Sequence, residues 1–337
     1  MILTNKSKAA NENSLMNRLR NILRYGDRPW NLVLIAAAIL GSLLVLSIGG
    51  LLWVNSAEAR AAFGWSFLTP TMNASWNPVK DIYQSWPFIY GTLITSVVAL
   101  IIALPIAIGV AIFLAELCPA WLRNPLNWMV ELLAAIPSVV YGLWGIFIFL
   151  PVIVTRVGEV LGFTLGRVPL LSLLFQGTIP SSGSSRLAAA LVLSIMVIPT
   201  IAAVTRDVFL AIPSSQREAS LAVGGTQWET IWHVIIPYGL SGILGAVILG
   251  FGRALGETMA VTMIIGNSIE GSLSLLRPGY TMSSVIANEF AEAVSQLHSQ
   301  ALIEIGLILF VITLLLNIVA RLLVMRIGRR TPQAVRA

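Results

Sequence analysis

Six long runs of apolar residues constrain the fold of this chain more than any other feature. An α-helix needs about 20 apolar residues to cross the roughly 30 Å hydrocarbon core of a bilayer, and each run approaches or exceeds that length. Charged residues make up only 11% of the chain, against roughly 25% in a typical soluble domain. We therefore predict an all-α integral membrane protein with six transmembrane helices. The runs lie near residues 31–54, 88–115, 127–154, 187–205, 239–265 and 301–325.

The first run could instead be a secretory signal peptide, because Ala57-Glu58-Ala59 resembles a cleavage site. The run at 31–54 is, however, longer than the roughly 7–15 apolar residues of a signal peptide, and the mostly polar residues 1–30 precede it. We favour a cytoplasmic tail over 1–30, a retained helix over 31–54 and an extracytoplasmic loop over 55–87.

The positions of lysine and arginine predict the orientation. They are concentrated at the two ends of the chain, in residues 1–30 and 326–337. Because cytoplasmic segments are enriched in these residues, we expect both termini in the cytoplasm, together with the loop at 211–238. The net charge of +6 could suggest nucleic acid. The basic residues flank apolar runs, however, so we predict a lipid bilayer as the partner and no nucleic acid.

Side chains for a metal centre or a disulfide are lacking. Cys118 is the single cysteine, and the two histidines, His233 and His298, fall on opposite sides of the predicted membrane. None of the lysines lies in a Gly-x-x-x-x-Gly-Lys-Ser/Thr segment, the loop that cradles the phosphates of ATP. We therefore expect no cofactor and no enzymatic activity, so a partner subunit must supply any ATP hydrolysis.

Arg253 and Glu257 are the most informative charged residues, because the fifth predicted span places Arg253 near its centre. A charge at that depth costs at least about 2.5–3.5 kcal/mol and usually marks a transport pathway. Glu257 lies four residues further on, where a continuous helix allows an ion pair. The alternative is a buried pair that only fixes helix packing. On the same helix, Gly252 and Gly256 would let a neighbouring helix approach closely.

A polar segment between two apolar runs, residues 211–238, carries a spaced motif. Its order is Glu218-Ala219, then Gly224, then Pro237, and it resembles the EAA loop of ABC-importer permeases. Three positions depart mildly from that pattern: Ser220, Val234 and Ile236. The resemblance implies a short cytoplasmic helix that docks into a groove of an ATPase subunit, with Glu218, Ala219, Gly224 and Pro237 as coupling residues.

Two tryptophans in this segment have two possible roles. Trp228 and Trp232 are four residues apart, so both would lie on one helix face. They could be apolar anchors in a partner's groove, or they could lie at the membrane interface.

Residues 252–262, 131–142 and 287–293 resemble the phosphate-importer permease family called PstC. The resemblance implies a type I (MetI-like) core over 88–325 with an extra N-terminal helix, in a bacterial plasma (inner) membrane. It also implies four partners: a PstA-like permease as heterodimer, two copies of a PstB-like ATPase, an extracytoplasmic PstS-like binding protein and phosphate. Arg253 and Glu257 match the family's functional arginine and glutamate. The identification of phosphate as the substrate rests on this resemblance alone.

Three other interpretations stay open. The chain could be a permease for another oxyanion, or a proton-coupled secondary transporter with Glu131, Arg253 and Glu257 as a relay. It could also be a membrane sensor whose loop binds a regulator. Glu116, Glu131 and Glu304 are weaker candidates for a direct role in transport, because each lies near the end of a predicted span, where Glu131 and Glu304 could snorkel or pair.

Overall fold

The computed structural model describes residues 27–70, 76–169, 171–269 and 271–328, so most of the two predicted tails lies outside the described residues. Within these ranges the regular elements are helices, and β-structure is limited to two isolated bridges. Six helical stretches of the described chain are long and apolar enough to cross a membrane, which confirms the predicted fold class. They are Trp30–Asn55, Trp86–Leu117, Ser138–Arg167, Arg186–Leu210, Gln227–Gly256 and Gln296–Arg326.

The first of these stretches belongs to helix α2 (Asp27–Asn55), which makes up the described part of the first of two units, Met1–Val54. Its apolar side chains point in every direction around the axis, as the four consecutive exposed residues Leu32, Val33, Leu34 and Ile35 illustrate. A helix that is apolar all round is typical of a membrane span.

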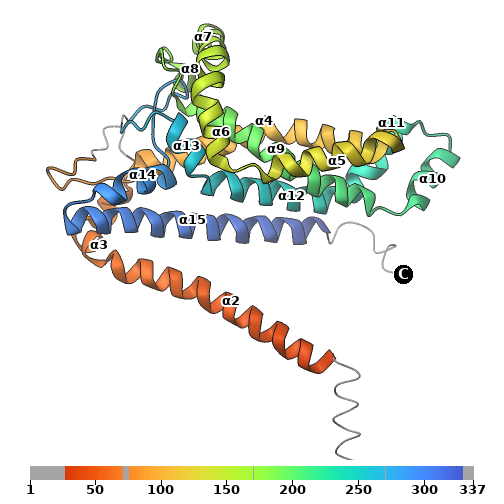
Figure 1. Ribbon diagram of the computed structural model, residues 1–337, viewed down its shortest axis with the longest axis horizontal. Coiled ribbons are helices and arrows are strands. Elements are labelled where there is room, and N and C mark those ends of the chain that lie inside the picture. The colour runs from red at the N-terminus through yellow and green to blue at the C-terminus, as the bar shows by residue number, and fades with distance from the viewer. Residues whose placement is uncertain (1–26, 71–75, 170, 270, 329–337) are drawn as a thin grey trace, which may run out of the picture. The chain divides into compact units, whose positions relative to one another are not determined.

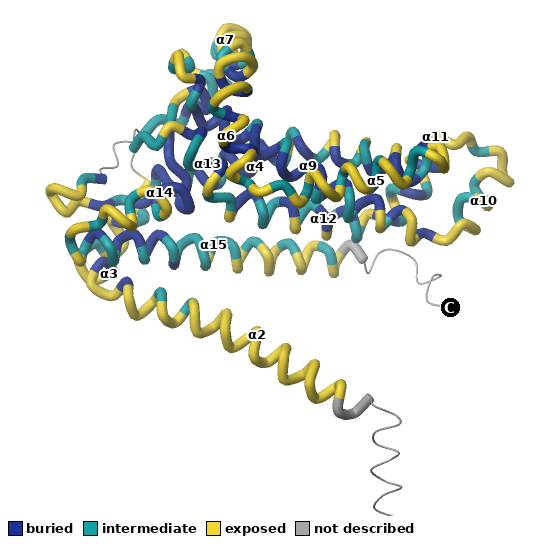
Figure 2. The backbone as a smooth tube through the Cα atoms, in the orientation of Figure 1, coloured by how far each residue is buried: buried dark blue, intermediate teal, exposed yellow. Residues whose placement is uncertain are grey.

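In the second unit, four long helices run side by side (Figure 1). Helix α9 packs against both α4 and α12, and α12 also packs against α15. Most residues of α9 are buried, whereas one side of α15 stays exposed (Figure 2). Helix α9 is therefore the centre of the bundle. The four helices are α4 (Trp86–Ile112), α9 (Arg186–Leu210), α12 (Ile236–Gly256) and α15 (Gln296–Gly328).

Small side chains allow this close packing. Alanines recur at every fourth residue of α4, and all are fully buried: Ala99, Ala103, Ala107 and Ala111. Helix α12 meets α9 at Gly250, where an added Cβ atom would lie 2.6 Å from Ile201 Cγ1. Small residues let helix backbones approach closely in membranes, so these positions fix how α4, α9 and α12 fit together.

The predicted third span, 127–154, is wrong as a single helix. Helix α5 (Ala120–Ala135) ends just before Pro137, and Ile136 is extended with ψ 130°. A proline disfavours helical backbone at the residue before it. Figure 1 shows α6 and α7 turned away from the direction of α5, which lies along α9. The segments after the break are α6 (Ser138–Trp144), the π-helical η3 (Gly145–Val154) and α7 (Thr155–Thr164).

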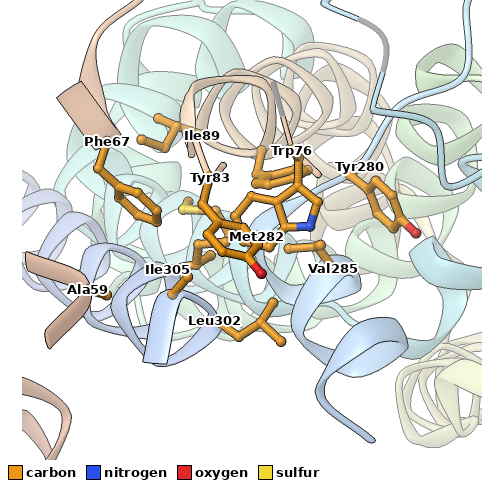
Figure 3. Close-up of a cluster of buried hydrophobic side chains, with 12 residues drawn as sticks. Ala59, Phe67, Trp76, Tyr83, Ile89, Tyr280, Met282, Val285, Leu302 and Ile305 are labelled. Atoms are coloured by element: carbon orange, nitrogen blue, oxygen red, sulfur yellow. The ribbon is translucent and has the colours of Figure 1, made fainter. Parts of the chain in front are cut away.

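Aromatic side chains fill the end of the second unit that carries α3 (Ala57–Phe63) and α14 (Met282–Glu289) (Figure 3). The Trp76 ring lies 4.7 Å from that of Tyr83 and 5.0 Å from that of Phe88, both edge to face. Burial raises the pKa of Tyr83 to about 12, so its phenol stays protonated at physiological pH. The loop predicted at 55–87 therefore contains a packed aromatic core.

Shorter elements complete the second unit. The α10 and α11 helices lie at one end of the bundle, and α3 and α14 lie at the other (Figure 1). The remaining elements are η1 (Gly64–Leu68), η2 (Phe113–Leu117), η4 (Leu165–Arg167), α8 (Ser172–Phe175), α10 (Ser214–Ala222), α11 (Gln227–Thr230), η5 (Ile231–Ile235), α13 (Met259–Ile264) and η6 (Phe290–Glu292).

Candidate functional site

Arg253 and Glu257 lie on either side of a helix end. Helix α12 ends at Gly256, and Glu257 has an extended backbone (φ −67°, ψ 126°). The Glu257 carboxylate accepts a hydrogen bond of 3.3 Å from the Ala260 backbone N–H, in the first turn of α13. Glycine is a weak helix former, so Gly256 favours the end of α12. The hydrogen bond to Glu257 favours the start of α13. The fifth predicted span, 239–265, is therefore wrong at its C-terminal end.

The predicted ion pair between Arg253 and Glu257 is also wrong. Side chains four residues apart are neighbours only where the helix continues between them. The ion pairs among the described residues do not include these two. Arg253 lies in the last turn of α12, where the partial negative charge of the C-terminal carbonyl groups stabilises a cation. Its predicted place at the centre of a continuous helix is not observed.

The Arg253 guanidinium has donors to offer an anion. The side chain is partly buried, and its Nε is shielded from solvent with no hydrogen-bond partner in the described chain. The Tyr141 side chain of α6 interacts electrostatically with Arg253 and donates a hydrogen bond of 3.0 Å to Leu133 O. A guanidinium can hold two oxygen atoms of a phosphate or carboxylate at once. The arrangement is suited to transient binding of an oxyanion.

Gly252 and Gly256 do not pack against another helix within this chain. An added Cβ atom at either position would meet no atom of the described chain within 4 Å. The tightly packed glycines of α12 are instead Gly242 and Gly250, whose added Cβ atoms would lie 2.5 Å from Val208 Cγ2 and 2.6 Å from Ile201 Cγ1. Helix α12 thus faces α9 with another side, and within the described chain no helix makes the close contact predicted at Gly252 and Gly256.

The predicted coupling residues Glu218, Ala219 and Gly224 lie on or next to α10, and all three are exposed. Gly224 follows the helix with φ +95°, a left-handed conformation that glycine adopts at little cost. Pro237 is the second residue of α12 and directly follows the π-helical η5. A proline inside a membrane helix is tolerated where local π-helical adjustment satisfies the freed backbone groups. The motif therefore forms a helix–turn–helix unit at one end of the bundle.

The Gly224 turn gives a first prediction. The variant Gly224→Ala should destabilise the α10–α11 unit by about 1–2 kcal/mol, because a Cβ atom disfavours the left-handed conformation. A steric clash with neighbouring atoms does not contribute to this loss of stability, because no atom lies within 4 Å of a Cβ added at Gly224. Faster hydrogen exchange in residues 214–230 would report the loss. The control is Gly109→Ala in α4, which also has nothing within 4 Å but no positive φ. Equal exchange in the two variants would contradict the prediction.

A hollow with apolar neighbours lies beside α10. It has a volume of about 630 Å³ and is lined partly by Ala219, Val223 and His233. Trp228 and Trp232 are 59% and 50% exposed, and their rings meet edge to face at 5.7 Å. Exposed tryptophans can serve either a partner or the membrane interface, so both predicted roles for the pair stay open.

One contact at this end of the bundle was missed by sequence reasoning. Arg217 of α10 makes an ion pair with Glu116 of η2, with an N–O distance of 2.7 Å. In the sequence, Glu116 stands out only as an acidic residue near a span end, and Arg217 only as a cytoplasmic charge. Their positions differ by 101 in the sequence, which leaves no local signal for the pair.

Two weaker acidic candidates have different surroundings. Glu131 pairs with Arg206 at 3.2 Å, and Arg206 also contacts Asp207 at 2.8 Å. Glu304 is only 6% exposed, interacts electrostatically with Arg60, and has one carboxylate oxygen without a hydrogen-bond partner in the described chain. Glu131 thus pairs, as predicted, whereas Glu304 is buried and does not snorkel.

A second hollow, of about 760 Å³, lies beside α14 in the segment 287–293. Glu289 lines this hollow. Its carboxylate accepts a hydrogen bond of 2.6 Å from Trp76 Nε1 and lies 3.2 Å from His298 Nε2. Burial raises the pKa of Tyr280, whose hydroxyl accepts a hydrogen bond of 2.8 Å from Asn288. These polar groups satisfy one another, which is typical of a packed structural region.

Residues 107–331 match the model of the family described as binding-protein-dependent transport system inner membrane component. The chain belongs to this family. It is therefore a multi-pass transport subunit of the inner membrane, and the predicted family and permease fold are confirmed. The family name includes a binding protein, and ABC permeases work with an ATPase, so these two classes of partner are supported in general.

Curated relatives of this permease cover almost its whole length. The phosphate transport system permease protein PstC of Mesorhizobium japonicum is 47% identical over 296 residues, which is 88% of this chain and 89% of the relative. The PstC protein of Pasteurella multocida is 47% identical over 293 residues, covering 87% and 90%. At this level of identity the permease belongs with the PstC proteins.

Solved structures support the fold alone. A bacterial alginate ABC transporter in complex with its periplasmic protein aligns with a TM-score of 0.51 and 17% identity, covering 72% of this permease and 78% of that chain. The MetNI methionine ABC transporter aligns with a TM-score of 0.50 and 17% identity, covering 72% and 94%. These structures therefore support a MetI-type permease fold for this chain.

Proposed function

We propose that this permease imports phosphate across the inner membrane, using energy from a separate ATPase subunit. The observation that carries the substrate is its 47% identity to PstC phosphate permeases over 88% of the chain. The chemistry of the site agrees with that substrate, because Arg253 is partly exposed, has no ion-pair partner among the described residues and lies beside a break between two helices. An exposed or partly exposed guanidinium is a good ligand for phosphate oxygens.

In this proposal Arg253 and Glu257 line the translocation path. Arg253 binds phosphate transiently as it passes the break between α12 and α13. Conduction requires binding that is weak enough for release. Glu257 is not paired with Arg253, so its carboxylate leaves the guanidinium free to bind phosphate. The negative charge of Glu257 repels the bound phosphate and so limits how long it stays at Arg253. Gly252 and Gly256, which are open in this chain, are available for close contact with a second permease subunit.

The coupling unit α10–α11 is proposed to bind the ATPase. Glu218 and Ala219 are exposed on α10, the left-handed Gly224 shapes the turn, and Pro237 is the second residue of α12. This unit would lie in the cytoplasm with both termini, as the positive-inside rule predicts. The full importer would contain this permease, a PstA-like permease, two PstB-like ATPase subunits and a PstS-like binding protein on the outer face.

Uptake of labelled phosphate into proteoliposomes tests this proposal. The permease is reconstituted with its candidate permease and ATPase partners, and the binding protein is added outside. Uptake that needs ATP and exceeds uptake of sulfate supports phosphate import. Preferential uptake of sulfate would indicate another oxyanion, and uptake driven by a pH gradient without the ATPase would indicate a secondary transporter. Binding of a regulator with no uptake under any condition would indicate a sensor.

A further inference from the structure

Arg217 and Glu116 form a forked ion pair at the base of the coupling unit. Arg217 Nη2 donates to Glu116 Oε1 at 2.7 Å, and Arg217 Nε donates to Oε2 at 3.1 Å. The side chains are only 23% and 10% exposed. A two-point contact between a guanidinium and a carboxylate fixes direction as well as distance. Helix α10 is therefore fastened to η2, which continues the span that begins with α4.

The same guanidinium is also fastened to the end of α9. Arg217 Nη1 donates to Ile212 O at 2.6 Å, and Nη2 donates to Phe209 O at 2.7 Å. Helix α9 ends at Leu210, so these carbonyl groups lie in its last turn and just beyond it, where side-chain donors commonly bind. A single side chain of α10 thus holds the ends of two central helices of the bundle.

Glu116 makes a further connection through its backbone. Gln227 Nε2, at the start of α11, donates to Glu116 O at 3.2 Å. Beneath these polar contacts lies a buried apolar cluster that joins the ends of α4 and α9 to the start of α12: Ala111, Ile112, Ala115, Phe209, Ile212, Ile231, Ile235 and Ile243. Packed interiors transmit displacement because they have little free space.

We propose that Glu116 and Arg217 are positioning residues that transmit movement of α10 to α4 and α9. This inference rests on the proposed function, because it assumes that an ATPase moves α10. Glu218 is the next residue after Arg217, about 100° further around the helix, and it is exposed. A partner can therefore contact α10 through Glu218 while Arg217 holds the helix to the bundle on another side.

The test uses the reconstituted full complex and two conservative variants. Glu116→Gln keeps the shape of the side chain but removes its charge, and Arg217→Lys keeps the charge but loses the fork. Each variant should lower the phosphate taken up per ATP hydrolysed by at least about fivefold, because the forked charged contact is lost. The ATPase should still co-purify with each variant. The double variant should be no worse than the worse single variant, as expected for two residues acting through one contact.

Matched controls are available on α7, where Glu159 and Arg156 are both exposed. Glu159→Gln and Arg156→Lys make the same chemical changes and should leave the uptake per ATP unchanged. The inference is overturned if either Glu116→Gln or Arg217→Lys keeps the wild-type ratio, or if the effects of the two simply add. Loss of ATPase co-purification would also overturn it, because the pair would then serve docking. A wild-type complex without ATP-dependent uptake would instead refute the proposed function, and with it this role.

Discussion

Replacing Arg253 by glutamine should reduce phosphate uptake by about a hundredfold or more, since the lost charged contact to a phosphate is worth roughly 3 kcal/mol. The protein should still fold. Removing one member of a buried ion pair strands the other charge at a high cost, but Arg253 has no ion-pair partner among the described residues. Uptake in proteoliposomes and thermal unfolding in detergent would measure the two effects separately.

Two further variants make this prediction sharper. Arg253→Lys keeps the positive charge without the planar fork, so its uptake should lie between those of the wild type and Arg253→Gln. Arg156→Gln removes an exposed arginine from α7 and should leave uptake unchanged. Normal transport by the Arg253→Gln variant would remove Arg253 from the translocation path.

Replacing Trp228 and Trp232 together by alanine should weaken binding of the ATPase by about thirtyfold or more. Tryptophans at the centre of an interface commonly contribute about 2 kcal/mol or more, and a loss of about 2 kcal/mol for the pair corresponds to about thirtyfold in affinity. The fold should change little, because the two side chains are 59% and 50% exposed and make their ring contact with each other. Affinity between the solubilised permease complex and the ATPase is the measurement.

Trp121→Ala is the control for this pair, because Trp121 of α5 is 77% exposed. It removes an equally large exposed side chain from another helix, and ATPase binding should not change. An unchanged affinity in the Trp228→Ala/Trp232→Ala variant would assign the two tryptophans to the membrane interface, which is the other role that their spacing allows.

The number of membrane helices could be predicted from the sequence because each span needs a long apolar run. Where helices break was harder to predict. The apolar run 127–154 continues through Pro137 without a change in hydropathy, yet the helix ends there because the proline restricts Ile136. At Gly256 the run also continues, and the break depends on the Glu257 cap of α13. Both breaks lie within apolar runs, where the spacing of apolar residues does not indicate where a helix ends.

The candidate site was predicted in part. Arg253 was identified because a charge inside an apolar run is costly and therefore informative. Its predicted pairing with Glu257 was wrong because the argument assumed an unbroken helix. Glu116 and Arg217 lie 101 residues apart and meet only through the packing of α9 against α4. A contact of this kind depends on tertiary structure, and local sequence patterns do not encode it.

Side-specific labelling of α10 tests whether the coupling unit lies in the cytoplasm and binds an ATPase. Ala219→Cys places an exposed thiol on α10, and Cys118→Ser removes the native, buried cysteine. A membrane-impermeant maleimide should label Cys at this position in inside-out vesicles, should fail to label it in intact spheroplasts, and should be blocked when the ATPase is bound. Labelling from the outer face of intact spheroplasts would contradict the account, because the coupling unit would then lie on the side of the membrane without ATP.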